Sequence, residues 1–298
     1  MPTSPLLTTI PHASLPQWMG ATPLAEATQP LWVLVGLPYD GTTSYRPGTR
    51  FAPPALREAS WGLETYAPLW HRELGVDVLY ADGGDLELPP GNRDACLARM
   101  GEAAEAVLNA GHHWLGLGGE HLVTLPAFNA HLKRYPELAI LHFDAHADLR
   151  EDFMNEALSH ATVLRRCVEQ ISPDRYVQVG IRSGTPEEWA WMRQHDTLLP
   201  SDEASMPASI AEARRRLGNR PVYLTIDLDV LDPSILPGTG TPEPGGLTYD
   251  QLQRWLLGMR GLNVVGADVV ELSPPYDNSD VSTVVAAKVV RDVLMLAG

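Results

Sequence analysis

Short apolar runs alternate with helix-favouring segments along most of this 298-residue chain. Apolar runs rich in β-branched residues predict buried strands at 31–37, 76–80, 114–117, 139–143, 176–181, 222–226 and 264–270. Helix-forming segments predict helices at 54–61, 92–110, 125–134, 161–169, 186–195, 208–217, 249–258 and 282–296. Strands that alternate with helices favour a mainly parallel sheet covered on both faces. The pattern therefore predicts an α/β fold.

Residues 1–30 differ from the rest of the chain. They are rich in Pro, Thr and Ala without clear periodicity, and they predict an N-terminal arm or irregular cap. Beyond them no long Ser/Gly tract, charge block, repeat or low-complexity segment divides the sequence. A hydrophobic fraction of 44% is typical of a globular protein with a sizeable core. We therefore expect residues 31–298 to form a single domain.

The net charge of −15 argues against nucleic acid and anionic membranes as partners, since both select basic patches. It favours the attraction of a cationic substrate, although acidic charge also simply keeps proteins soluble. No apolar run is long enough to span a bilayer, and residues 1–5 do not resemble a signal peptide. We therefore expect a cytoplasmic protein in which Cys96 and Cys167 are buried thiols rather than a disulfide.

Residues whose side chains can bind metal come immediately after three of the predicted strands. Asp144, His146 and Asp148 alternate after the run 139–143, and an Asp-Leu-Asp pair follows the run 222–226. A Gly-Gly-Glu-His turn follows the run 114–117. Open parallel sheets place their sites beyond the carboxyl ends of the strands, so these side chains should converge. The candidate ligands are His121, Asp144, His146, Asp148, Asp227 and Asp229.

This set contains carboxylates and imidazoles but no thiolate, and it is too large for one zinc ion. Carboxylate-rich sites suit Mn or Mg, and histidine favours Mn. Because a carboxylate can bridge two ions, the set fits a binuclear centre that activates water for hydrolysis. A lone Asp at a strand end is most often a cap or turn former, but the combination favours a metal centre. Glu120 beside His121 is expected to be structural or to support a ligand.

Eight segments resemble, in order, the signatures of the ureohydrolase family, which includes arginases and agmatinases. They are residues 38–41, 50–53, 118–121, 143–148, 227–233, 237–242, 245–247 and 270–277. The resemblance covers roughly residues 31 to 295. It implies a three-layer α/β/α sandwich with a mainly parallel central sheet, two Mn(II) ions per subunit, and a homo-oligomer, either trimer or hexamer.

The resemblance also implies roles for individual residues. It makes Asp144 and Asp227 bridges between the ions, assigns His121 and Asp148 to one ion, and assigns His146 and Asp229 to the other. His160 matches the family's proton-shuttling histidine, whose pKa range suits transfer to a leaving amine. Glu271 matches the carboxylate that pairs with the substrate guanidinium, and Thr241 would support Glu271.

The loop 149–158 is expected to select the substrate. It lacks the Asn-Thr-Pro pattern of arginases, and Ser183 stands where arginases place an Asp. Its acidic side chains suit a second cation, so we favour agmatine, cleaved to putrescine and urea. Candidates for binding the distal ammonium are Glu151, Asp152 and Glu156. Arg150 would instead attract a carboxylate, which keeps guanidinobutyrase, guanidinopropionase, arginase and formimidoylglutamase as alternatives.

A non-catalytic, metal-stabilised scaffold is the alternative from a different class. It predicts the loss of a metal ligand, of His160 or of Glu271, and the sequence retains all of them. The small cationic guanidino substrate therefore remains the expected partner.

Overall fold

The computed structural model describes residues 12–13, 17–27 and 29–297. Within them nine strands form one sheet in the order β1-β5-β2-β6-β11-β10-β7-β8-β9, in which only β1 runs antiparallel to its neighbour. The strands are β1 (His12–Ala13), β2 (Trp32–Gly36), β5 (Tyr80–Leu86), β6 (His113–Leu117), β7 (Ala139–Phe143), β8 (Tyr176–Val179), β9 (Leu198–Leu199), β10 (Val222–Asp227) and β11 (Val264–Val270). A separate hairpin joins β3 (Tyr66–Ala67) to β4 (Arg72–Glu73). The predicted, mainly parallel sheet is confirmed.

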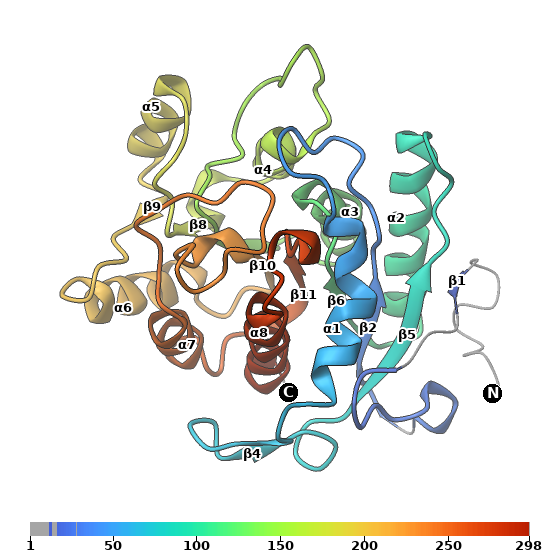
Figure 1. Ribbon diagram of the computed structural model, residues 1–298. Coiled ribbons are helices and arrows are strands. Elements are labelled where there is room, and N and C mark those ends of the chain that lie inside the picture. Colours follow the sequence, from blue (N-terminus) through green and yellow to red (C-terminus); the bar gives the residue numbers. More distant parts are fainter. Residues whose placement is uncertain (1–11, 14–16, 28, 298) are drawn as a thin grey trace.

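Helices cover both faces of this sheet. They are α1 (Ala52–Ser60), α2 (Arg93–Asn109), α3 (Thr124–Arg134), α4 (Val163–Val168), α5 (Pro186–His195), α6 (Met206–Leu217), α7 (Tyr249–Gly258) and α8 (Val281–Ala297). One apolar core, which contains Leu56, Trp255 and Val289, packs under α1, α6, α7 and α8. A second core, which contains Phe128 and Leu164, packs under α2 to α5. This confirms the three-layer sandwich, and Figure 1 shows α1 and α8 in front of the sheet.

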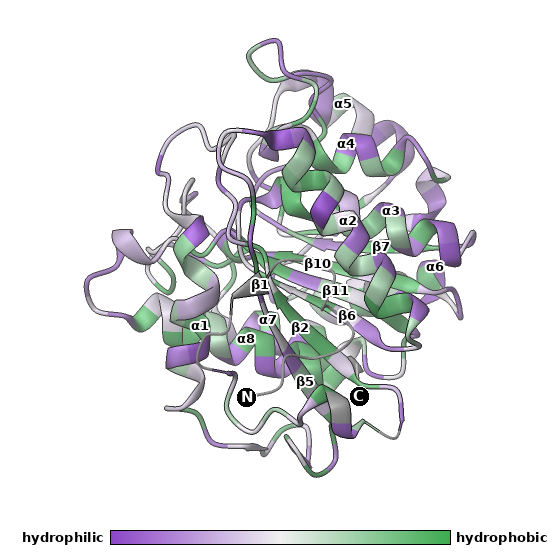
Figure 2. Cartoon of the chain, turned by 90° about the vertical axis from the view of Figure 1, so that its right-hand side faces the viewer, coloured by the Kyte–Doolittle hydropathy of each residue, from purple (hydrophilic) through white to green (hydrophobic). Residues whose placement is uncertain are grey.

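Burial of apolar surface on both faces explains why the strands read as continuous hydrophobic runs. In Figure 2 the strands and the sheet-facing sides of the helices are mostly hydrophobic. Cys96 and Cys167 are buried free thiols, as predicted. Among the helices of the described residues, none combines the length and apolar content that a membrane span requires.

The predicted strand at 76–80 is wrong. Val76 is 69% exposed in a turn closed by the bond from the Val76 N–H to the Glu73 carbonyl, and the strand begins only at Tyr80. The observed strand β5 carries Asp82 and Asp85, which break the apolar pattern that predicts buried strands. Their burial is possible because the Arg57 side chain of α1 pairs with both carboxylates.

The predicted arm, residues 1–30, lies partly outside the described residues. In the described part, Trp18 is buried, and its backbone N–H donates to Asp82 at 2.7 Å. The backbone N–H of Thr22 donates to the Tyr80 carbonyl at 2.8 Å. The described part of this segment therefore packs on strand β5.

The strand order brings together the strands that precede the candidate ligands. β6, β11, β10 and β7 are consecutive neighbours in the sheet, and all four are parallel. Their carboxyl ends consequently meet at one edge. In Figure 1 this edge faces upward, and the loops that follow β2 and β7 rise above it.

Candidate metal centre and active site

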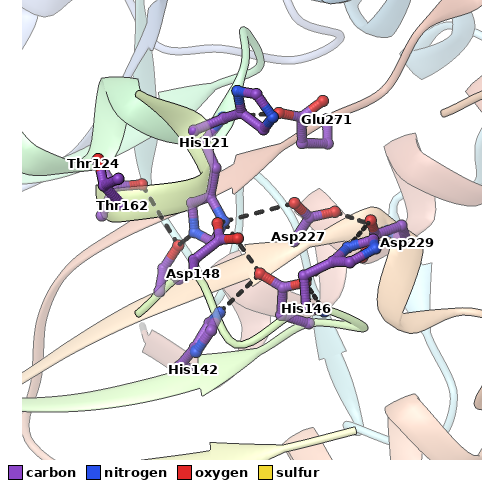
Figure 3. A network of polar contacts seen from close by, with 12 residues as sticks. His121, Thr124, His142, His146, Asp148, Thr162, Asp227, Asp229 and Glu271 are labelled. Atoms are coloured by element: carbon purple, nitrogen blue, oxygen red, sulfur yellow. Dashed lines mark hydrogen bonds and ion pairs between the residues drawn. The ribbon is translucent and has the colours of Figure 1, made fainter. Parts of the chain in front are cut away.

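The six predicted metal ligands lie together at this edge. Asp144, His146 and Asp148 lie in the loop after β7, Asp227 ends β10, and Asp229 lies in the 3-10 helix Leu228–Val230. The sixth, His121, opens the 3-10 helix His121–Val123 after β6. Figure 3 shows Asp148, Asp227, Asp229 and His146 turned toward a common space.

A glycine allows His121 to reach this position. Gly119 has φ +111°, and a Cβ there would lie 2.3 Å from the Leu37 carbonyl oxygen. The Gly119 carbonyl also accepts the backbone N–H of Glu271 at 2.9 Å. The Gly-Gly turn therefore lets the backbone after β6 pass closely between the segments that follow β2 and β11, and it brings His121 beside Glu271.

The Nδ1 atom of His121 faces three carboxylates. It lies 3.1 Å from Asp144 Oδ2, 3.0 Å from Asp148 Oδ2 and 3.4 Å from Asp227 Oδ2. This nitrogen is buried and has no hydrogen-bond partner among the described residues. A buried polar atom without a partner is costly, whereas an ion bound between these atoms would satisfy all four groups.

The second half of the cluster is built around His146. Its Nδ1 lies 2.9 Å from Asp229 Oδ2 and 3.7 Å from Asp144 Oδ1. The Asp144, His146 and Asp229 donor atoms can hold a metal ion. Asp144 presents Oδ2 to His121 and Oδ1 to His146, which is the arrangement of a carboxylate between two ions.

The charges of the cluster match two divalent ions. Asp144, Asp148, Asp227 and Asp229 are all buried, and no Lys or Arg forms an ion pair with them among the described residues. Uncompensated buried charge is strongly unfavourable, and four carboxylates balance two divalent cations. Burial and the neighbouring Asp229 raise the pKa of Asp144 to about 6. Burial lowers the pKa of His146, but Asp229 outweighs it and raises that pKa to about 10. The cluster therefore favours added positive charge.

His142, not predicted as a site residue, contacts the cluster from β7. Its Nε2 lies 2.8 Å from Asp144 Oδ2, and its Nδ1 lies 2.9 Å from the Tyr176 hydroxyl. With both ring nitrogens engaged, His142 orients the Asp144 carboxylate rather than offering a free ligand atom. The sequence signal was a histidine within an otherwise apolar strand.

His160 lies in the same cavity as the metal cluster. The cavity is lined by Ser44, His146, Ala147, Asp148, Arg150, Phe153, His160, Ala161, Ser183, Gly184, Glu188, Asp227, Thr241 and Glu271. The His160 Nε2 lies 3.2 Å from the Ser44 hydroxyl, and its backbone N–H donates to Thr42 at 3.0 Å. Burial lowers the pKa of His160, so its imidazole is largely neutral near pH 7.

Glu271 lies beside the cluster and is buried. Its Oε1 accepts the backbone N–H of His121 at 2.8 Å, and its φ of +66° places the side chain in a left-handed turn after β11. Burial and the neighbouring Glu120 raise the pKa of Glu271 well above its ordinary range. Glu120 itself accepts bonds from Thr42 and Thr43, which agrees with the structural role expected for it.

Thr241 is in the cavity, but its hydroxyl contacts Asp229 rather than the carboxylate it was expected to support. The distance from Thr241 Oγ1 to Asp229 Oδ2 is 3.3 Å. Thr241 therefore stabilises a predicted metal ligand. Thr241 differs from the expectation because the loop after Leu236 brings its hydroxyl within hydrogen-bond distance of Asp229.

The structure does not bring the three acidic loop residues into the cavity. Glu156 pairs with Arg93 of α2 at 2.5 Å, and Glu151 pairs with Arg165 of α4 at 3.3 Å. Asp152 is exposed and accepts the backbone N–H of Asn155 at 3.2 Å in a local turn. Their contact with the distal end of a substrate is therefore not supported by this geometry.

Glu188, unlike those three loop residues, lines the active-site cavity. It is buried in α5, accepts the Leu149 N–H at 2.8 Å and the Thr185 N–H at 2.7 Å, and lies 3.8 Å from Arg150. The Thr-Pro-Glu-Glu segment that starts α5 is a capping box, which sequence reading can recognise. Its position against the metal-binding loop cannot be read from that motif.

A mainly parallel sheet with a carboxylate and histidine cluster at its carboxyl edge is the arrangement expected of a metal-dependent hydrolase. The family model for the Arginase family matches residues 31–296. The chain is 47% identical to an agmatinase from Bacillus anthracis over 265 residues, 88% of this chain and 90% of the relative.

Two solved structures have the same fold. The agmatine ureohydrolase of Thermoplasma volcanium superposes with a TM-score of 0.84 at 31% identity, covering 96% of this chain and 95% of that one. The proclavaminate amidino hydrolase of Streptomyces clavuligerus also superposes with a TM-score of 0.84 at 31% identity, covering 96% and 98%. The chain belongs to the arginase family and is a hydrolase.

Proposed function

We propose that this hydrolase is a binuclear-manganese enzyme that converts agmatine and water to putrescine and urea. The observation that carries the proposal is the cluster of four buried carboxylates and two imidazoles, three of which (His146, Asp148 and Asp227) line one cavity with Glu271 and His160. The name of the Bacillus anthracis relative, agmatinase, supports the choice of agmatine. When bound, two Mn(II) ions supply Lewis acidity and a deprotonated water near neutral pH.

The chain's own residues bind the substrate and move protons. Glu271 has one oxygen held by the His121 N–H, which leaves the other free to accept a guanidinium N–H. His160, whose imidazole is neutral, first accepts the proton that the reacting water gives up and then returns that proton to the leaving amine. The Phe153 ring packs edge-on against His160, which restricts the orientation of the imidazole.

The part of the cavity that Arg150 and Glu188 line would contact the distal end of the substrate. The Glu188 oxygens there each accept one backbone N–H, and each keeps a further lone pair that suits the distal ammonium of agmatine. The net charge of −15 attracts the same dication at longer range.

Arg150 supports a second candidate, a guanidino acid such as 4-guanidinobutyrate. It lines the cavity with a side chain 39% exposed, and its guanidinium would pair with a substrate carboxylate. The amidino hydrolase from Streptomyces clavuligerus, named for proclavaminate, shows that a chain of this fold need not be an agmatinase.

A urea-release assay with added Mn(II) tests the proposal. It compares agmatine, arginine, 4-guanidinobutyrate and 3-guanidinopropionate, with formamide release from formimidoylglutamate measured in parallel. We expect the highest kcat/KM with agmatine and its loss on metal chelation. The highest kcat/KM with a guanidino acid would establish the second candidate instead, and no turnover of any of these compounds would refute both. The trimeric or hexameric assembly and the cytoplasmic location remain predictions. Light scattering would test the assembly.

A further inference from the structure

A chain of buried polar groups lies on the side of His121 opposite to the carboxylates. His121 Nε2 lies 2.9 Å from Thr225 Oγ1, and the Thr225 hydroxyl donates to Asp268 Oδ1 at 2.6 Å. All three residues are fully buried, and Thr225 of β10 and Asp268 of β11 are direct partners in the strand register. None of the predicted ligand roles requires Thr225 or Asp268, so this series of hydrogen bonds has a role beyond those already assigned.

The direction of these hydrogen bonds follows from the donors available. The second oxygen of Asp268 accepts the Tyr223 hydroxyl at 2.6 Å, so both of its oxygens face hydroxyl donors. Burial raises the pKa of Asp268, while the Thr225 and Tyr223 hydroxyls lower it. Thr225 has a single proton, which goes to Asp268, and its oxygen is left to accept a bond from His121.

This direction fixes the tautomer of His121. An acceptor at Nε2 requires the proton on Nε2, which leaves a lone pair on Nδ1. The Nδ1 atom is the one that faces Asp144, Asp148 and Asp227. Three carboxylate oxygens within 3.4 Å of that nitrogen would otherwise favour a proton on Nδ1, where it would block a metal ion.

We propose that Asp268 and Thr225 are positioning residues that hold His121 in the tautomer able to ligate a metal ion through Nδ1. The proposal rests on the proposed function, since it assumes that the cluster binds metal. Neither residue touches substrate. Their effect is exerted on the affinity of the ion that His121 holds, and groups of this kind change metal affinity by about 10- to 100-fold.

Titration of the metal-free protein with Mn(II) tests this, with unbound Mn(II) measured by electron paramagnetic resonance. The variants are Thr225→Val, which replaces the hydroxyl with a methyl group, and Thr225→Ala, which removes it without added bulk. We expect each variant to retain one tight Mn(II) and to bind the other about 10- to 100-fold more weakly. Thr225→Ser restores the hydroxyl and should bind both ions within about threefold of the wild type.

Thr197→Val is the matched control. The Thr197 hydroxyl is also buried and donates to a side chain, Gln178 Oε1, at 2.8 Å, but among the described residues it forms no hydrogen bond with Thr225, Asp268 or a predicted metal ligand. Its Mn(II) affinities should equal those of the wild type. The melting temperature of each metal-free variant separates loss of packing from loss of ligand positioning.

Unchanged affinities in both Thr225→Val and Thr225→Ala would overturn the inference. Equal weakening of both ions, or the same weakening in Thr197→Val, would overturn it in favour of a packing effect. A wild-type protein that binds fewer than two Mn(II) per chain would instead refute the binuclear centre itself.

Discussion

The Phe153 ring lies edge-on to the His160 imidazole, with ring centroids 5.5 Å apart and an interplanar angle of 75°. Phe153 also lines both the active-site cavity and a second cavity, which Tyr39, Thr43 and Glu156 line as well. Edge-to-face ring pairs contribute about 0.5–1.5 kcal/mol. We therefore expect Phe153→Ala to lower kcat/KM by about 2- to 12-fold, because the His160 imidazole loses the aromatic ring that packs against it.

Steady-state kinetics with agmatine measures this effect, and Phe153→Tyr is the control because it retains the ring. Phe153→Tyr should keep most of the kcat/KM that Phe153→Ala loses. Equal values for Phe153→Ala and the wild type would show that the ring does not position His160.

His160→Ala should abolish most turnover without removing metal. His160 contacts Ser44 and Thr42 but none of the predicted metal ligands through a hydrogen bond among the described residues. Loss of a general acid typically lowers kcat by about 10²- to 10⁴-fold. Elemental analysis should still find the wild-type metal content. The control is His195→Ala at the end of α5, and wild-type turnover in His160→Ala would remove the proton-transfer role.

Glu271→Gln should weaken substrate binding while both ions stay bound. The glutamine oxygen can still accept the His121 N–H, which Glu271 accepts at 2.8 Å, so the local backbone is preserved. Loss of a charged hydrogen bond costs about 1.5–3 kcal/mol, which corresponds to a rise in KM of about 10- to 150-fold. Kinetics and metal analysis of the same sample measure both quantities. An unchanged KM would contradict guanidinium pairing by Glu271.

The sequence identifies those parts of the structure that depend on local pattern. The sequence predicts the strand 264–270 to the residue because that run is almost wholly apolar, and it identifies Asp227 and His146 because one ends such a strand and the other follows one. Their convergence follows from the parallel strand order, which the alternation of strands and helices also indicates.

Other features depend on partners distant in the sequence. Thr225 and Asp268 are single polar residues in two apolar strands, and only the strand register reveals that they are neighbours. The acidic loop was assigned to the substrate from its composition, but Arg93 and Arg165, from two different helices, pair with its glutamates. Charge alone does not show which side chains of a loop face a cavity.

The pairing of Arg57 with Asp82 and Asp85 should account for a large share of stability. All three are buried, with Arg57 Nε 2.8 Å from Asp82 Oδ2 and a further bond from Arg57 to Asp85. Arg57→Met would leave two buried carboxylates without a cation, which costs about 3–5 kcal/mol. Asp82 also accepts the Trp18 N–H, so the described part of the N-terminal segment should detach more readily in the variant.

Denaturant unfolding in the presence of Mn(II) measures this loss, and Arg254→Met is the matched control. Arg254 pairs with Glu203 at 2.6 Å, but its side chain is 42% exposed, so its removal should leave the free energy of unfolding nearly unchanged. Burial already raises the pKa of Asp85, and Arg57 opposes that rise. Without Arg57 the folded-state pKa rises further above the unfolded value, so the folded state binds more protons and the deficit should shrink as the pH falls. Equal losses in the two variants, or a deficit that grows at low pH, would show that the buried pairing does not stabilise the fold.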